Sequence, residues 1–310
     1  MSNIEFPKNY EYYLKKGQEA LEGHRLAEGV VQLEKAYQLE QDPVVNWLIA
    51  TTTFEIADYS KSLSYIEELP DFYVEEESRA ELYLQNLLME KDFLNARKLL
   101  WEIKKQGKLN KYKIQNLTNL LEMQEKFYRQ TQQSLIQEIK QELVELSKYS
   151  AAYQLQKVQK IKDLPQADLL DVSKKLLIDP RISLLVRNFL FEELVKVGTQ
   201  ERVSILTIDG KINHLYPNEI GASDTMVLTS NIMDKLEITL ENQDPILLEN
   251  LREEVKVEMA ILYPLHQLYE DSKFWVNSYL SEYLHKDYPL DQEIELVRGK
   301  IKRELNRFYE

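Results

Sequence analysis

A repeat of about 34 residues constrains the fold of this chain more than any other feature of its sequence. The aromatic or large apolar positions that mark it, at intervals of 33, 34 and 34 residues, are Leu26, Tyr59, Phe93 and Phe127. Three residues after each of these come Gly29, Ser62, Ala96 and Gln130. A fixed period of this length is typical of stacked helical hairpins, which present an extended surface and no buried catalytic pocket. The repeat therefore predicts an all-α protein that binds a partner.

The composition favours long helices and excludes several kinds of chemistry. The 310 residues include only 8 Gly and 9 Pro, which favours long regular elements. The lack of cysteine excludes disulfides, thiol catalysis and cysteine-ligated zinc. Because no apolar run of about 18 residues occurs and no secretory signal is recognisable, we expect a cytoplasmic protein without a membrane span.

Charge is distributed unevenly along the chain. The net charge of -13 disfavours nucleic-acid binding, which needs a basic surface, so we expect no nucleic-acid partner. Residues 101–160 nevertheless carry an excess of positive charge, which is concentrated in Lys104, Lys105, Lys108, Lys111 and Lys113. This stretch is either a solvated turn between helices or a docking patch for an acidic partner.

Start and stop signals divide the repeats into pairs of antiparallel helices. The first three pairs are expected over residues 10–22 with 25–40, 43–56 with 58–70, and 76–90 with 92–107. Aspartates at positions 42, 58 and 92 are the expected N-caps, and Gly107 is the expected C-terminal glycine. A fourth pair begins near Lys111, and its second helix is expected to run from about Lys126 towards Tyr149.

The first unit resembles the tetratricopeptide repeat family. It carries Tyr13, Gly17 and Ala20 where the family has Trp, Gly and an apolar residue. It carries Leu26, Gly29 and Ala36 where the family has an aromatic residue, a small residue and Ala. The two glycines are expected to let the paired helices approach closely. Later units match less completely, and the fourth has Gln130 and Gln137 where small or apolar residues are expected. The resemblance covers about residues 8–140 and implies a right-handed solenoid of helical hairpins.

In that family the first helix of each hairpin lines an inner groove, so the resemblance implies a partner-binding groove. Carried over by position, the groove residues are Leu14, Gln18, Trp47, Thr51, Glu81, Gln85, Tyr112, Gln115 and Asn119. They lack the lysines and asparagines with which some relatives grip acidic chaperone tails. Trp47 is the expected anchor, because large aromatic side chains dominate binding hot spots, and packing between hairpins is the alternative for it.

From about residue 150 the repeat fades while helices continue, so we divide the chain into helical repeats at 1–149 and a C-terminal helical region at 150–310. A helix pair over 169–178 and 181–197, joined and capped at Asp179-Pro180, is similar to a HEAT-type hairpin. A β-hairpin follows near 203–216, with a two-residue type I′ turn expected at Asp209-Gly210. It either covers neighbouring helices or offers an edge to a partner strand.

Four more helices are expected near 224–241, 245–268, 270–285 and 291–309, with Asp224, Asp244 and Asp291 as start signals. The last one carries an apolar stripe of Ile294, Val297, Ile301, Leu305 and Phe308. Its polar face is basic through Arg298, Lys300, Lys302, Arg303 and Arg307. A helix that caps the solenoid, a membrane-surface helix and a self-association surface are the alternatives for it.

Motifs for catalysis or cofactor binding are not recognisable. The four histidines are far apart in sequence, and no glycine-rich phosphate loop occurs. Glu254, Glu258 and His266 could ligate a metal from one helix face, but Pro264 interrupts that face. We therefore predict no enzyme, no metal and no cofactor.

The leading prediction is a non-catalytic scaffold or adaptor that binds a protein or peptide on a concave helical-repeat surface. One alternative is a small-ligand regulator or enzyme with a pocket where the two halves meet. A second alternative is a self-associating structural protein, which would be a homo-oligomer. Taken whole, the chain is also similar to uncharacterised tetratricopeptide-type repeat proteins of low-GC Gram-positive bacteria, a resemblance that implies no known activity.

Overall fold

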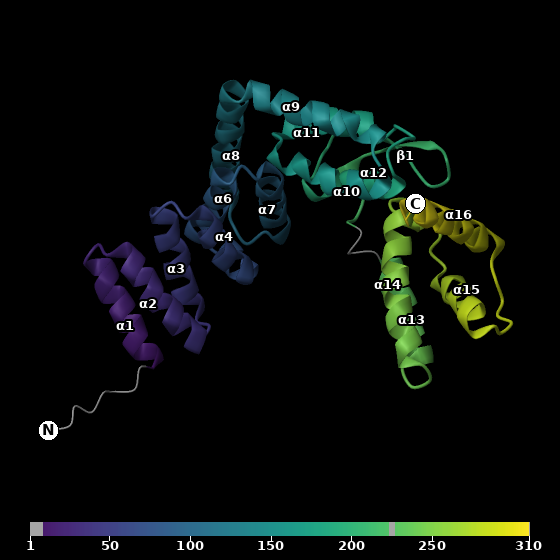
Figure 1. Cartoon of the computed structure of the whole chain (residues 1–310), viewed down its shortest axis with the longest axis horizontal. Helices are drawn as coiled ribbons and strands as arrows, with labels where there is room; N and C mark the ends of the chain where they lie inside the picture. The colour runs from purple at the N-terminus through teal and green to yellow at the C-terminus, as the bar shows by residue number, and fades with distance from the viewer. Residues whose placement is uncertain (1–8, 223–226, 310) are drawn as a thin grey trace. The chain divides into compact units, whose positions relative to one another are not determined.

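The computed structural model describes residues 9–222 and 227–309. These residues are mostly helical, with one small two-stranded antiparallel sheet, as the sequence predicts. The chain forms two compact units, Met1–Thr131 and Gln132–Glu310, which we call unit 1 and unit 2 (Figure 1). Among the described helices, none combines the length and the apolar character that a membrane crossing needs.

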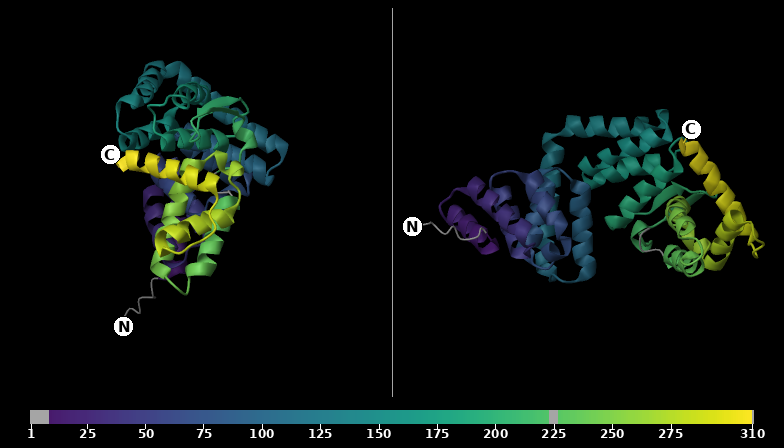
Figure 2. Two further views of the ribbon diagram at one scale, coloured as in Figure 1. Left: turned by 90° about the vertical axis from the view of Figure 1, so that its right-hand side faces the viewer. Right: turned by 60° about the horizontal axis from the view of Figure 1, so that its bottom comes forward.

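Unit 1 consists of eight described helices. In chain order they are α1 Tyr10–Glu22, α2 Leu26–Leu39, α3 Pro43–Glu55, α4 Tyr59–Glu68, α5 Pro70–Val74, α6 Glu77–Met89, α7 Phe93–Gln106 and α8 Lys111–Thr131. The pairs α1–α2, α3–α4 and α6–α7 pack as hairpins, which lie side by side in Figures 1 and 2. All three pairs lie within two residues of their predicted bounds.

The predicted helix caps of these hairpins are confirmed. The side chain of Asp42 accepts a hydrogen bond from the Val44 amide at 2.7 Å, and Asp92 accepts one from the Asn95 amide at 3.0 Å. Asp58 caps α4 in the same way. Gly107 ends α7 with a φ of 65°, the left-handed conformation that glycine adopts without strain. Local sequence signals were sufficient here because a cap needs only its own turn.

The close approach of α1 and α2 depends on two glycines, as predicted. A Cβ atom on Gly17 would lie 2.7 Å from both Cγ and Cδ2 of the fully buried Leu33. A Cβ atom on Gly29 would lie 2.5 Å from Cδ2 of Leu21. Real Cβ atoms do not approach other atoms this closely, so a larger residue at either position would force the facing leucine side chain to shift.

We expect Gly17→Ala to destabilise unit 1 by about 1–2 kcal/mol, because the overpacking of Leu33 outweighs the roughly 1 kcal/mol that alanine gains in a helix. Gly299→Ala in the last helix is the matched control, since its Cβ would meet nothing within 4 Å. That variant should gain up to about 1 kcal/mol. Urea unfolding measures both. Equal effects of the two substitutions would show that α1 and α2 are not in close contact.

The core of unit 1 contains a buried polar centre, around Asn46, that the sequence analysis did not identify. Asn46 on α3 is fully buried, and its Nδ2 donates to the carbonyl of Tyr65 at 3.0 Å and to the hydroxyl of Tyr37 at 3.2 Å. Its Oδ1 accepts from the buried hydroxyl of Tyr73 at 2.7 Å. Because these partners come from α2, α4 and α5, one amide fixes how four helices pack.

The predicted fourth hairpin is wrong. Helix α8 continues without a break from Lys111 to Thr131, through the position where a second helix was expected to begin. Phe127, the expected packing residue, is 63% exposed, whereas its neighbour Tyr128 is buried and packs on Phe93 with ring centroids 4.9 Å apart. The next helix, α9 Gln133–Val144, packs on elements of unit 2. The units consequently divide after Thr131, whereas the fading of the repeat suggested residue 149.

Unit 2 combines α-helices, short 3-10 helices (η) and two strands. After α9 come η1 Glu145–Lys148, α10 Ala151–Lys157, η2 Val158–Asp163, α11 Gln166–Leu176, α12 Leu184–Lys196, β1 Val203–Leu206, β2 Ile212–Leu215 and η3 Pro217–Glu219. The chain then forms α13 Val227–Leu240, α14 Pro245–Leu262, η5 Leu265–Leu268, α15 Ser272–Leu284 and α16 Gln292–Tyr309. Asp244 and Asp291 cap α14 and α16 as predicted. Asp224 lies outside the described residues.

Two local predictions in unit 2 are wrong. Strands β1 and β2 pair from Val203↔Leu215 to Leu206↔Ile212, so the connection has five residues and is not a two-residue type I′ turn. Within it Gly210 has a positive φ and Asp209 does not. The side chain of Asp209 instead accepts from the Thr207 hydroxyl at 2.6 Å and the Lys211 amide at 3.1 Å, which holds the wider loop.

The second wrong prediction concerns the start of α12. Asp179 does not cap this helix, which begins only at Leu184. Its carboxylate instead accepts from the Arg181 amide at 2.9 Å and pairs with the Arg181 guanidinium. The connection between α11 and α12 is therefore longer than expected.

Candidate functional site

The predicted groove residues lie on the first helices of the hairpins and on α8, and all of them remain partly or fully exposed. Helix α6 packs on both α3 and α8, so these three helices are neighbours. We call the predicted residues on these helices the first-helix face: Trp47, Thr51, Glu81, Gln85, Tyr112, Gln115 and Asn119. The other two predicted residues, Leu14 and Gln18, lie on α1, which packs chiefly on α2.

Trp47 packs between helices and also keeps part of its surface exposed. It is partly buried and packs against the core cluster of Ala50, Ile66, Tyr73 and Leu82. Part of its indole surface remains accessible on the first-helix face. A substitution here would therefore change both the packing of the hairpins and the exposed surface, so Trp47 is a poor site for testing binding alone.

Polar side chains of the first-helix face pair within their own helices. Gln85 Nε2 donates to Glu81 Oε1 at 3.0 Å on α6, and Gln115 Nε2 donates to Asn119 Oδ1 at 2.8 Å on α8. These are contacts between residues four positions apart on exposed helix surfaces, where such pairs contribute little to stability. A partner could exchange them for its own hydrogen bonds at small cost.

The face continues along α8 with two apolar residues that the sequence analysis did not assign to it. Met123 is 67% exposed and Phe127 is 63% exposed, and they follow Asn119 at intervals of four residues. Tyr112, one end of the same stripe, is 75% exposed. The spacing could have revealed this stripe, but the period of the repeat assigned Phe127 to the core.

The predicted basic patch is smaller than the sequence suggests. Lys108 pairs with Glu75 at 3.3 Å and Lys113 pairs with Glu77 at 3.2 Å. Lys104 and Lys105 are exposed in the last turn of α7, where cations interact favourably with the helix dipole. Within the described part of the chain, these two and Lys111 form no ion pair, so three lysines remain available to an acidic partner.

The three potential metal ligands are not brought together in unit 2. Glu258 on α14 is fully buried and accepts from the Tyr279 hydroxyl at 2.7 Å and from Arg298 Nε at 3.1 Å. Glu254 faces the same arginine at 3.3 Å, whereas His266 stacks on Tyr263. Over the ranges that the structure describes, no group of three or more metal-ligating side chains is present.

Arg298 does not belong to an outer basic face of α16, so that part of the prediction is wrong. It is 3% exposed, contacts Glu254, Glu258 and Glu282, and lies over the Tyr279 ring at 3.9 Å. Burial alone would lower its pKa, but the facing carboxylates outweigh burial and hold the pKa of Arg298 above its usual value. This cluster is a buried ion network that joins α14, α15 and α16.

The apolar stripe of α16 is also used within unit 2. Ile294, Val297 and Ile301 are all at most 4% exposed. Helix α16 packs on α10, α14 and α15, which cover this stripe. These three residues are therefore part of the core and are not free to bind a membrane surface or a second copy of the chain, whereas Leu305 is half-buried and the Phe308 side chain lies outside the described ones.

Comparison with known proteins gives no match to a family model, none to a curated protein and none to a solved structure. The assignment of function therefore depends on the geometry of the chain itself. The first-helix face of unit 1 is the surface that both the sequence and the exposure of its residues indicate.

Proposed function

We propose that unit 1 is a tetratricopeptide-like adaptor, a right-handed solenoid of helical hairpins that binds a protein segment along the first-helix face. The observation that carries this proposal is the stripe of exposed large side chains, Tyr112, Met123 and Phe127, on α8. Met123 and Phe127 are about one turn apart, and Tyr112 lies about 16 Å further along the same helix. Groups of exposed apolar residues often mark binding surfaces. The first-helix face leads directly onto this stripe.

The chemistry of the face indicates what kind of segment it fits. Apolar side chains of the partner would pack on Tyr112, Met123 and Phe127, which is how an amphipathic helix binds an exposed groove. Lys104, Lys105 and Lys111 lie at the α7–α8 turn, next to the Tyr112 end of the stripe. The partner segment is therefore expected to be apolar on one side and acidic at one end, because opposite charge accelerates association.

We expect the double variant Met123→Ser/Phe127→Ser to lose its partner while it keeps its fold. Both side chains are more than 60% exposed, so the change in the free energy of unfolding should stay within about 1 kcal/mol. The experiment is affinity capture from a native lysate with the intact chain as bait, quantified by mass spectrometry. Binding of each captured candidate is then measured with purified proteins, where we expect at least about tenfold weaker affinity in the double variant.

The matched control is Val31→Ser/Leu39→Ser. These residues are 47% and 58% exposed on α2, the second helix of its hairpin, and so lie outside the first-helix face. This control should bind like the unchanged protein. A partner that binds both double variants equally well would contradict the proposal, and so would the absence of any specific partner at low salt.

A further inference from the structure

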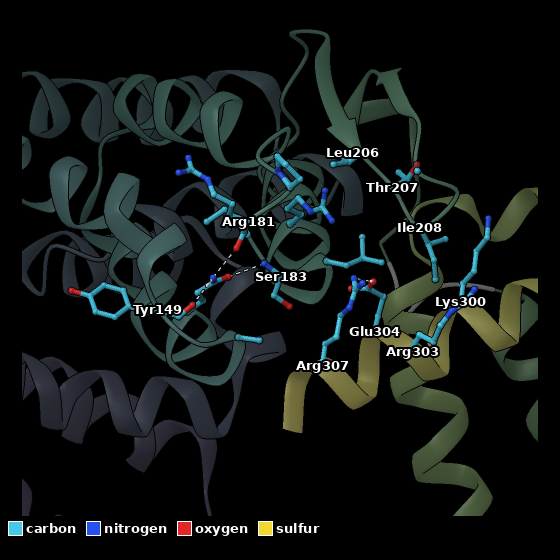
Figure 3. A pocket seen from close by; sticks show the side chains of 17 residues that line it. Tyr149, Arg181, Ser183, Leu206, Thr207, Ile208, Lys300, Arg303, Glu304 and Arg307 are labelled. Atoms are coloured by element: carbon cyan, nitrogen blue, oxygen red, sulfur yellow. Dashed lines mark hydrogen bonds and ion pairs between the residues drawn. The ribbon is translucent and has the colours of Figure 1, made fainter. Parts of the chain in front are cut away.

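Unit 2 contains a pocket of about 440 Å³ that the proposed function does not use. Its walls come from four parts of the unit, several of which Figure 3 shows: the last turns of α16, the α11–α12 connection with the start of α12, the end of β1 with the loop that follows it, and α10 with the residue Tyr149 before it. Helix α10 packs on both α12 and α16, which sets these walls opposite one another. All of the lining residues belong to unit 2.

Gln154 on α10 holds the α11–α12 connection in place. Its side chain is 2% exposed, and its Nε2 donates to the carbonyls of Tyr149 and Arg181, each at 3.0 Å. Its Oε1 accepts from the Ser183 amide at 2.7 Å (Figure 3). Because every polar atom of this amide is used, the start of α12 has a fixed position at the pocket.

Cationic side chains dominate the lining of the pocket. It contains five of them and one carboxylate, in a chain whose net charge is -13: Arg181, Arg187, Lys300, Arg303, Arg307 and Glu304. The N-terminus of α12 also lines the pocket, and its N-cap residue Ser183 makes no side-chain cap. The positive end of this helix therefore adds to the field of the cations.

Arg187 is the feature that distinguishes this pocket from a merely basic surface. It lines the pocket from α12 and is only 6% exposed, and its Nε and Nη1 atoms are buried without a hydrogen-bond partner. Burial lowers its pKa to about 10, so the guanidinium is still charged at neutral pH. A buried charge without a partner is strongly unfavourable, and proteins normally pair it.

The acidic groups nearest to Arg187 are already engaged elsewhere. Its electrostatic neighbours are Glu304 and Asp179. Arg307 pairs with Glu304 at 2.7 Å, and Arg181 pairs with Asp179 at 2.7 Å. The chain itself therefore leaves Nε and Nη1 of Arg187 without a partner, although four further cationic side chains line the same pocket.

We propose that this pocket binds a small phosphorylated molecule, with Arg187 as the buried anchor for the phosphate group. A phosphate dianion matches several cations that converge from different elements, accepts bidentate hydrogen bonds from a guanidinium and suits a helix N-terminus. Lys300 and Arg303 supply further contacts from α16. The apolar side of the pocket, formed by Ile182, Leu184, Leu206 and Ile208, would receive the organic part of the ligand. Its volume lies in the range of small-ligand sites.

Isothermal titration calorimetry on the intact chain tests this proposal with five probes: pyrophosphate, inorganic phosphate, adenosine 5′-monophosphate, adenosine and succinate. We expect the three phosphates to bind, and adenosine and succinate to bind at least about tenfold more weakly. Arg187→Met should weaken phosphate binding by about tenfold to a hundredfold, because it removes charge-assisted hydrogen bonds. Arg252→Met is the matched control, since Arg252 is on α14 outside the pocket, and it should bind normally.

Thermal unfolding separates a binding role from a structural role for Arg187. Removal of an unpaired buried charge should raise the Tm of the ligand-free chain by about 2–4 °C, whereas an arginine that holds the fold together would lower it on substitution. Pyrophosphate should raise the Tm of the unchanged protein and not that of Arg187→Met. If Arg187→Met does not fold, the exposed-side variant Lys300→Gln/Arg303→Gln provides the same binding comparison.

Three results would overturn the proposal. The first is the absence of phosphate binding at low salt, which would mean that water alone fills the pocket. The second is phosphate binding that persists unchanged in Arg187→Met or in Lys300→Gln/Arg303→Gln. The third is equal binding of succinate and pyrophosphate, which would indicate a site for anions in general. None of these outcomes depends on partner binding by unit 1, because the two sites share no residue.

Discussion

Replacing Arg298 with methionine should destabilise unit 2 by about 3–5 kcal/mol, the range observed when one member of a buried ion pair is removed. The substitution leaves Glu258, which is fully buried, without its cation, and it leaves Glu254 facing it as a second carboxylate. It also removes the donor to Ser278 at 2.6 Å and the cation over the Tyr279 ring. Urea unfolding, followed by circular dichroism, measures the loss.

The electrostatics of the cluster explain why the effect should be large. Burial raises the pKa of Glu254, and burial together with the charge of Glu258 raises that of Tyr279 well above its usual value. Arg298 is the cation that opposes both effects, since its charge favours the ionised form of each group. Without Arg298, the carboxylates of Glu254 and Glu258 would share a poorly solvated site and would lose the cation that they both contact.

Arg307→Met is the matched control for this prediction, because it makes the same change on the same helix at a side chain that is 73% exposed. Its pair with Glu304 joins neighbouring turns of α16, where surface pairs contribute at most about 1 kcal/mol. Similar stability of the two variants would mean that Glu258 has access to water and that the network does not join the helices.

Ile301→Asp should destabilise unit 2 by more than about 4 kcal/mol, a large share of the roughly 5–15 kcal/mol by which native proteins are usually stable. Ile301 is fully buried on α16, and Val297, one turn before it, is also buried. Helix α16 packs on α10, α14 and α15. Aspartate there would replace apolar packing with an unpaired buried charge. Circular dichroism and limited proteolysis of the region after Thr131 would follow the loss of structure.

Leu296→Asp is the control on the same helix, since Leu296 is 62% exposed, and it should change the free energy of unfolding by less than about 1 kcal/mol. The pair of variants also tests self-association through the terminal helix. If Ile301→Asp remained folded and only reduced the mass seen in light scattering, the apolar stripe would have to be accessible to a second copy. Its burial within unit 2 predicts a loss of stability instead.

The sequence by itself determined the parts of this protein that depend on neighbouring residues. Three helical hairpins, their aspartate caps and the glycine that ends α7 follow from signals that act within one or two turns. The close contact of α1 and α2 was predictable from Gly17 and Gly29, because a hairpin with a short connection brings its own two helices together. The residues of the first-helix face follow from the resemblance to the repeat family, and that they bind a partner stays a prediction.

Only the tertiary structure decided features that require distant segments to meet. Glu258 and Arg298 are 40 residues apart, and nothing in either helix alone shows that one faces the other. For this reason the sequence analysis assigned Arg298 to a basic, solvent-exposed face of the last helix. Lys300, two residues further on, is partly exposed, whereas Arg298 is buried. The continuity of α8 likewise depended on Tyr128 packing against Phe93, which shifts the buried position by one residue from the expected Phe127.

The pocket around Arg187 illustrates the same division. Arg187 lies in the helix that the sequence predicts over 181–197, but the surroundings of its side chain come from α10, α12, α16 and the β1–β2 loop. Whether an arginine is paired depends on which acids reach it, and here Arg307 and Arg181 engage the nearest ones. Charged side chains pair across space, and the packing of the core decides which helix faces meet. The spacing of residues in the sequence therefore determined the helices. The tertiary structure determined which charges remain unpaired.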